Sequence, residues 1–83
     1  MGSNEVLSDV GKICREVFSD PQLEINPNTT AKDVAGWDSM TNLFLIDAIE
    51  QRFKFKFTLD EIMNAQNVGE LCAIVVQRGQ IDR

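Results

Sequence analysis

Histidine is absent from the 83-residue sequence, which removes the commonest general base and the commonest zinc ligand of proteins. The four serines therefore cannot join a Ser–His–Asp arrangement, and neither paired carboxylates nor a glycine-rich phosphate loop appears. Cys14 and Cys72 lack the paired spacing of a zinc site, so we expect two buried or half-buried thiols. These absences argue against an enzyme and against a metal centre.

Positive charge is also scarce, because 13 acidic residues face 8 basic ones and the formal net charge is -5. This balance argues against nucleic acid and anionic membranes and favours partners with basic surfaces. No apolar run approaches the roughly 18 residues of a membrane span, and the N-terminus lacks a signal-peptide pattern. We therefore expect a cytoplasmic monomer that does not insert into a membrane. The length predicts one domain over residues 1–83, ordered over about residues 4–79 and frayed beyond.

Apolar residues at helical spacing predict an all-α fold with three substantial helices and one short one. The predicted helices are, in order, residues 4–18, residues 39–53, a short helix from the cap Thr58 to about Asn64, and a last helix between the cap Asn67 and the stop Gly79. The longest loop lies between the first two helices. No internal repeat and no domain boundary is visible.

The loop over residues 19–37 is rich in turn-forming Pro, Asn and Thr residues. Its apolar residues are expected to pin it across the helix ends: Leu23, Ile25, Val34 and Trp37. We interpret Trp37 as a core plug rather than a stacking platform. Residues 54–57 alternate lysine and phenylalanine, and we expect an extended connector with one or both rings turned inward. A basic–aromatic nucleic-acid patch is the alternative, which two lysines on an acidic chain do not favour.

The helix expected over residues 39–53 has apolar residues on two opposite faces. At about 100° per residue, one face gathers four residues that should pack into the core: Leu45, Ile46, Ile49 and Phe53. Four others share nearly the opposite face: Met40, Leu43, Phe44 and Asp47. Such a helix is either buried all round or keeps one side for a partner, and a short chain can hardly bury it fully. The second face therefore predicts a partner-binding surface.

Asp38 and Ser39 stand at the start of the same helix. The Asp38 carboxylate is a natural N-cap, since it can accept hydrogen bonds from the unpaired N–H groups of the first turn. Ser39 is a candidate attachment point, because unpaired N–H groups and the helix dipole favour an anionic substituent such as a phosphodiester there. The alternative is that both residues merely cap a helix, and it weakens once the apolar face from Met40 onward is considered.

The stretch GWDSM at residues 36–40, followed by the helix to Phe53, resembles the acyl carrier protein family, whose attachment motif is Asp-Ser-Leu. The likeness covers nearly the whole chain, from an amphipathic first helix to an apolar fourth. It implies a small four-helix bundle with a long loop between helices 1 and 2. It also implies that Ser39 bears 4'-phosphopantetheine as cofactor, while Asp38 caps the helix and assists metal-dependent loading by a phosphopantetheinyl transferase.

By this resemblance the protein is a non-catalytic carrier. It would hold acyl groups as thioesters on the arm and deliver them to separate acyl-loading and acyl-transfer enzymes. Fatty acid, modified lipid or polyketide biosynthesis are the pathway types that the resemblance suggests. The second helix is the main docking surface in this family.

Two departures from the family pattern bear on docking. Met40 replaces the usual Leu of the motif, a volume-conserving exchange that should cost little. Fatty-acid carriers typically have acidic residues at the positions of Thr41 and Phe44, and both are neutral here. We therefore predict docking that depends more on the apolar face of the helix than on ion pairs, in a specialised carrier rather than the main fatty-acid carrier.

Two alternatives stay open at this point. Leu45, Ile46 and Ile49 are candidates to line an acyl pocket, yet an ordinary packed core describes them equally well. The rival to a carrier is an unmodified helical adaptor that binds partners through Met40, Leu43 and Phe44. Ser39→Ala separates these two functions, because a carrier loses all activity and an adaptor keeps its partner.

Overall fold

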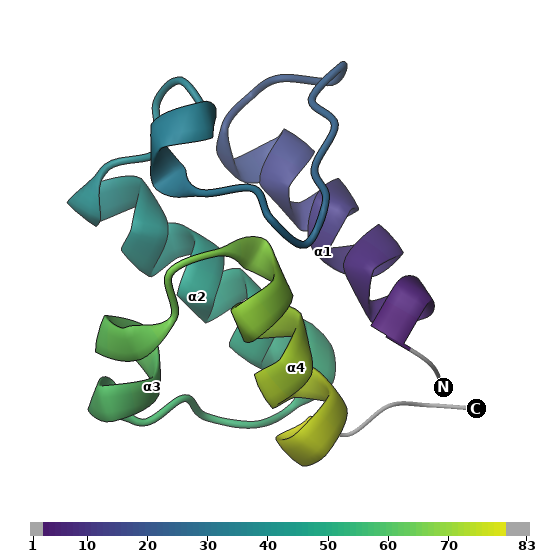
Figure 1. The fold of residues 1–83 in the computed structure, drawn as a ribbon, viewed down its shortest axis with the longest axis vertical. Helices are drawn as coiled ribbons and strands as arrows, with labels where there is room; N and C mark the ends of the chain where they lie inside the picture. The colour runs from purple at the N-terminus through teal and green to yellow at the C-terminus, as the bar shows by residue number, and fades with distance from the viewer. Residues whose placement is uncertain (1–2, 80–83) are drawn as a thin grey trace.

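The computed structural model describes residues 3–79, which form four α-helices and one short 3-10 helix (Figure 1). The elements follow in the order α1 (Ser3–Val17), η1 (Ala31–Asp33), α2 (Ser39–Phe53), α3 (Leu59–Asn64) and α4 (Val68–Arg78). The predicted all-α fold, with a short third helix and a long loop after the first, is confirmed. The prediction of a frayed end falls on residues 80–83, which lie outside the described part. None of the helices between residues 3 and 79 is long and apolar enough to cross a membrane.

The core lies between α1, α2 and α4, and α1 packs against both of the other helices. Phe53 is the largest of the fully buried side chains. The buried residues of α2 are the four predicted for its inner face: Leu45, Ile46, Ile49 and Phe53. Full burial of such a side chain stabilises the fold by about 1.5–3 kcal/mol. Packing of this inner face fixes the rotation of α2, and with it the direction of every other residue on the helix.

Both cysteines lie in this core as free thiols, as predicted. Cys14 comes from α1 and Cys72 from α4. Burial, as the main cause, raises the pKa of each thiol to about 11. Since the thiolate is the reactive form, both side chains act as small apolar residues at neutral pH.

The long first loop is tied to the N-terminus of α4. The Val68 N–H donates to the Thr29 carbonyl at 2.9 Å, and the Gly69 N–H donates to the Pro27 carbonyl at 2.8 Å. Asn67 caps the same helix, as predicted. The loop residues predicted to pin the loop are buried or half-buried: Leu23, Ile25, Val34 and Trp37. The short helix η1 was not predicted, because three residues carry too little periodic signal.

Gly69→Ala is expected to lower the free energy of unfolding by about 1–3 kcal/mol, since the new methyl group overpacks the contact between α4 and the loop. A Cβ at this position would lie 2.8 Å from the Pro27 carbonyl oxygen and 3.0 Å from the Pro27 Cβ. Urea unfolding followed by circular dichroism measures the change. Gly11→Ala is the matched control, because its Cβ would meet nothing closer than 3.6 Å. If the two variants lost the same free energy of unfolding, the close contact between Gly69 and Pro27 could not explain the effect.

The connector between α2 and α3 is extended, and its phenylalanine rings turn inward as predicted. Phe57 is buried, Phe55 is half-buried, and their ring centroids lie 4.7 Å apart. The Phe57 N–H donates to the Glu50 carboxylate at 2.8 Å. The predicted capping box then starts α3: the Thr58 hydroxyl accepts the Glu61 N–H at 3.1 Å, and the Glu61 carboxylate accepts the Thr58 N–H at 2.8 Å.

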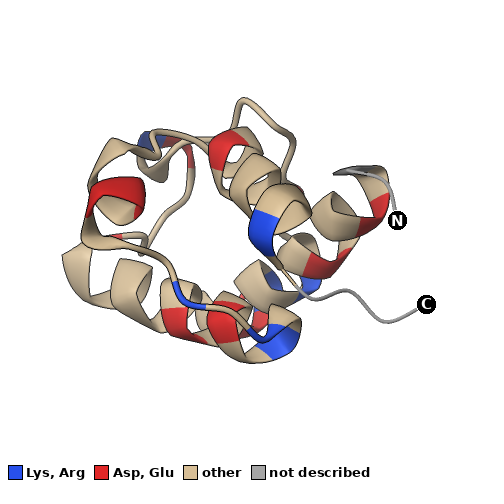
Figure 2. Ribbon diagram, turned by 90° about the horizontal axis from the view of Figure 1, so that it is seen from below, with Lys and Arg blue, Asp and Glu red and all other residues tan. Residues whose placement is uncertain are grey.

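The first half of α2 contains no charged residue between residues 39 and 46, and this stretch is drawn without blue or red in Figure 2. Among the described residues, ion pairs join different parts of the fold. Arg52 of α2 pairs with Asp9 of α1 at 2.9 Å, and Arg78 of α4 pairs with Glu61 of α3. The apolar outer face of α2 therefore stands apart from the ionic contacts that connect the helices.

Candidate functional site

Ser39 is the first residue of α2, and it is exposed. Asp38 caps the helix as predicted, because its Oδ1 accepts the backbone N–H groups of Met40 and Thr41, each at 2.9 Å. The Thr41 Oγ1 accepts the Asp38 N–H at 2.8 Å and donates to the Gly36 carbonyl at 2.7 Å. Gly36 has a φ of 87°, a left-handed conformation that glycine adopts readily. The first turn of α2 thus holds the segment before Ser39 in place.

The N-terminus of α2 offers less to an anion than the sequence suggested. The Asp38 carboxylate already takes the N–H groups of Met40 and Thr41, and it adds a negative charge beside Ser39. The helix dipole remains, and at an exposed site it contributes about 0.3–1 kcal/mol. The geometry therefore presents Ser39 as an accessible hydroxyl rather than as part of an anion-binding pocket.

The cap also predicts a response to acid. The Thr41 backbone N–H is the largest of the causes that lower the pKa of the Asp38 carboxyl from its ordinary value of 3.8. A carboxyl with a lowered folded-state pKa stabilises the fold fully above its unfolded pKa, and this contribution is lost as pH falls through the folded value. We expect Asp38→Asn, which still caps the helix, to lose less stability than the wild type below about pH 4. Urea unfolding across this pH range measures the free energy of unfolding of both proteins. Equal losses in Asp38→Asn and the wild type would contradict a stabilising role of the ionised Asp38 carboxylate.

Trp37 leads into the site and is half-buried. Its Nε1 donates to the Asn42 Oδ1 at 3.0 Å, and its ring lies 5.5 Å from the Phe18 ring, centroid to centroid. The predicted core plug is therefore partly right: Trp37 packs against the core, and it also forms part of a cavity wall. The sequence did not predict that Asn42 binds Trp37 and lines the cavity, because this contact depends on how the loop folds back onto α2.

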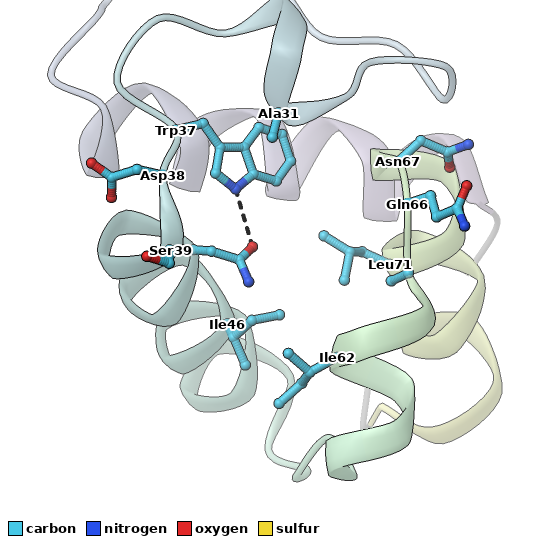
Figure 3. Close-up of a pocket in the computed structure, with 11 residues that line it drawn as sticks. Ala31, Trp37, Asp38, Ser39, Ile46, Ile62, Gln66, Asn67 and Leu71 are labelled. Carbon is cyan, nitrogen blue, oxygen red and sulfur yellow. Dashed lines mark hydrogen bonds between the residues drawn. The ribbon is translucent and has the colours of Figure 1, made fainter.

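A cavity of about 330 Å³ opens beside Ser39, between α2, α3 and the start of α4 (Figure 3). The side chains of Ile46, Ile62 and Leu71 point toward one another from these three helices. The cavity is lined by Ala31, Trp37, Asp38, Ser39, Asn42, Ile46, Ile62, Ala65, Gln66, Asn67 and Leu71. It therefore combines an apolar part with amide side chains and the Asp38 carboxylate, and none of the described residues that line it is basic.

The cavity resolves the two interpretations of the inner face of α2. Ile46 lines the cavity, whereas Leu45 and Ile49 do not and are fully buried in the core. Of the two interpretations that the sequence left open, a packed core therefore describes Leu45 and Ile49, and a cavity wall describes Ile46. Ile62 and Leu71 extend this apolar wall from two other helices, and no local pattern connects them with Ser39.

The outer face of α2 is exposed, as its two-sided pattern predicted. Met40, Leu43 and Phe44 are 65 %, 61 % and 58 % exposed. Asp47 is exposed as well, and its carboxylate accepts a hydrogen bond from the Gln51 Nε2 at 2.8 Å. Three large apolar side chains in water on one helix make a patch of the kind that binds another protein.

Comparison with known proteins points to one family. Residues 8–75 match the family model described as the phosphopantetheine attachment site. The acyl carrier protein of Acidothermus cellulolyticus is 26 % identical over 70 residues, which are 84 % of this chain and 83 % of that protein. The solution NMR structure of holo acyl carrier protein from Geobacter metallireducens has a TM-score of 0.83 and 34 % identity, over 88 % of this chain and 84 % of that chain. These matches do not favour an unmodified adaptor.

The residues around the cavity suit a phosphopantetheine group. An exposed serine hydroxyl offers the oxygen that a phosphodiester needs, and the amide side chains of Asn42 and Gln66 match the amide groups of a pantetheine arm. The apolar part suits an attached acyl chain. The family model, the relative and the solved structure agree with this chemistry, and the chain belongs to the acyl carrier protein family, with phosphopantetheine as its prosthetic group.

Proposed function

We propose that Ser39 is the attachment residue and that the protein delivers acyl groups to separate biosynthetic enzymes. The observation that carries this proposal is the place of Ser39, an exposed hydroxyl at the start of α2 in the lining of a partly apolar cavity. A phosphopantetheinyl transferase loads Ser39 from coenzyme A. Asp38 keeps the start of α2 in place and assists this metal-dependent loading. The bound group supplies the thiol that holds the acyl cargo as a thioester, and the chain itself is not catalytic.

The cavity gives the acyl cargo an apolar surface within reach of Ser39. Ile46, Ile62 and Leu71 remove methylene groups from water, at about 0.8 kcal/mol for each one buried. Asn42 is held by its hydrogen bond to Trp37, so one amide group of the lining is already oriented. Apolar acyl groups are therefore the cargo that this lining favours over charged ones.

Membership of this family implies interaction with a phosphopantetheinyl transferase and with acyl-handling enzymes. For this chain we place the docking surface on Met40, Leu43, Phe44 and Asp47. Since the first half of α2 carries no charge, its partners contact it mainly through apolar side chains. This surface fits a specialised carrier, in a modified lipid or polyketide pathway, better than a main fatty-acid carrier.

The experiment that tests this function loads the protein with an acyl group. Wild-type protein is incubated with an acyl-coenzyme A, Mg²⁺ and a broad-specificity phosphopantetheinyl transferase, and the product is treated with hydroxylamine. The wild type is expected to gain an acyl group that hydroxylamine removes. Ser39→Ala is expected to gain none, while its urea midpoint stays close to that of the wild type because Asp38 still caps α2. A folded wild type that gains no acyl group would overturn the proposal.

A further inference from the structure

α3 forms one wall of the cavity beside Ser39, yet it has little packing of its own. None of its six residues is buried. Leu59 and Met63 are 71 % and 72 % exposed. Ile62 is half-buried and packs against the core. An isolated helix of this length is not stable in water. The position of α3 therefore depends on the contacts that tie it to the rest of the fold.

Arg78, in the last turn of α4, supplies one such tie. Its guanidinium pairs with the Glu61 carboxylate of α3 and donates from Nη2 to the Lys56 carbonyl at 2.7 Å. It also lies 5.6 Å from the centroid of the Phe55 ring. The backbone N–H of Thr58 first, and then Arg78, hold the pKa of the Glu61 carboxyl below its ordinary value, so this carboxylate is ionised at neutral pH. One side chain thus connects α4 to α3 and to the connector before it.

The two ends of this tie differ in how firmly they are held. Val75, one turn before Arg78, is fully buried, so α4 is anchored in the core. α3 and the segment after it hold only partly buried or exposed residues, and they supply Ile62, Ala65 and Gln66 to the cavity (Figure 3). Local unfolding of α3, which breaks its own backbone hydrogen bonds and lets it leave α2, would therefore separate Ile62 from Ile46 and widen the cavity.

We propose that Arg78 is a positioning residue that sets the width of the cavity and thereby the size of the acyl group that the protein encloses. The inference rests on the proposed function, because it requires the acyl chain to enter this cavity. With the tie intact, α3 stays beside α2 and the cavity keeps its volume of about 330 Å³. With the tie broken, α3 opens more often and longer acyl groups enter.

Hydrogen exchange of the apo protein tests the first half of this inference. The amides of Ile62 and Ala65 report on α3, because they donate to the Thr58 and Glu61 carbonyls, each at 3.1 Å. In Arg78→Met their exchange is expected to be about fivefold faster than in the wild type, since a partly exposed ion pair and its hydrogen bonds are lost. Exchange at the wild-type rate would overturn the inference.

Arg52→Met is the matched control. Arg52 also pairs with a carboxylate, that of Asp9 at 2.9 Å, and also lies over a phenylalanine ring, 5.1 Å from the centroid of Phe53. It connects α2 to α1, however, whereas Arg78 connects α4 to α3. Its loss is expected to leave exchange in α3 unchanged, and an equal acceleration in both variants would overturn a specific role for Arg78. Arg78→Lys keeps the charge and is expected to fall between Arg78→Met and the wild type.

The second half is tested with an even-chain series of acyl groups attached to wild type and Arg78→Met. The melting temperature of the wild type is expected to rise with chain length and to level off once the cavity is full. In Arg78→Met this plateau is expected to move to longer chains by at least one member of the series. If both proteins load but the melting temperature levels off at the same chain length, the inference about Arg78 is overturned and the proposed function is not. A folded wild type that does not load would overturn the proposed function, and the size limit with it.

Discussion

Phe53→Ala is expected to lower the free energy of unfolding by about 3–5 kcal/mol, because truncating a buried phenylalanine loses its transfer free energy and leaves a cavity. Phe53 is the largest of the fully buried side chains and lies at the end of α2, where it meets the core. Urea unfolding followed by circular dichroism measures the change. If the variant is too unstable to fold, Ile49→Val removes one buried methylene from the same face and should cost about 0.5–1.5 kcal/mol.

Phe44→Ala is the matched control for this experiment. It makes the same substitution on the same helix, but Phe44 is 58 % exposed and belongs to the outer face. Its effect on stability is expected to stay within about 0.5 kcal/mol. Similar losses at Phe53 and Phe44 would contradict the division of α2 into a core face and a free face.

The second large effect is expected on docking, through the outer face of α2. Phe44→Ala is expected to weaken binding to a partner enzyme about ten- to a hundredfold, since a fully buried apolar side chain contributes about 1.5–3 kcal/mol. The Michaelis constant of a phosphopantetheinyl transferase for the carrier is one readout. Added salt should change it little, because no charged residue lies between Ser39 and Ile46 and screening acts only on charges.

Val76→Ala is the control for docking, because Val76 is a partly exposed apolar residue on α4 at 41 % exposure. It is expected to leave the Michaelis constant unchanged. The opposite pattern would be unchanged binding by Phe44→Ala, a large loss with Asp47→Ala and a steep dependence on salt. That result would contradict an apolar docking surface and would favour ion pairing through the second half of α2.

Much of the fold could be predicted from local signals. The caps at Asp38, Thr58 and Asn67 each appear in the sequence as a polar residue before a periodic stretch, and each accepts the expected backbone N–H groups. The burial of α2 on one face follows from spacing alone. The left-handed residue Lys54, which ends α2 with a φ of 58°, gave no such signal, because helix ends of this kind usually have glycine.

The candidate site was only partly predictable. Ser39 and Asp38 are adjacent, so their place at a helix start can be derived from a few neighbouring residues. The cavity joins Ile46, Ile62 and Leu71, which lie on three helices, and only the packed tertiary structure brings them together. A sequence pattern reports the period of one helix, and it does not report which of its inner residues face a packed core and which face a cavity.

We propose that this chain carries phosphopantetheine on Ser39, and the intact mass of the protein shows whether the group is attached there. Apo protein is incubated with coenzyme A, Mg²⁺ and a broad-specificity phosphopantetheinyl transferase, together with Ser39→Ala and Ser8→Ala. Ser8 is exposed on α1, so it controls for the loss of an accessible serine elsewhere. We predict one phosphopantetheine increment on the wild type and on Ser8→Ala, and none on Ser39→Ala. An increment on Ser39→Ala, or none on the folded wild type, would contradict the account.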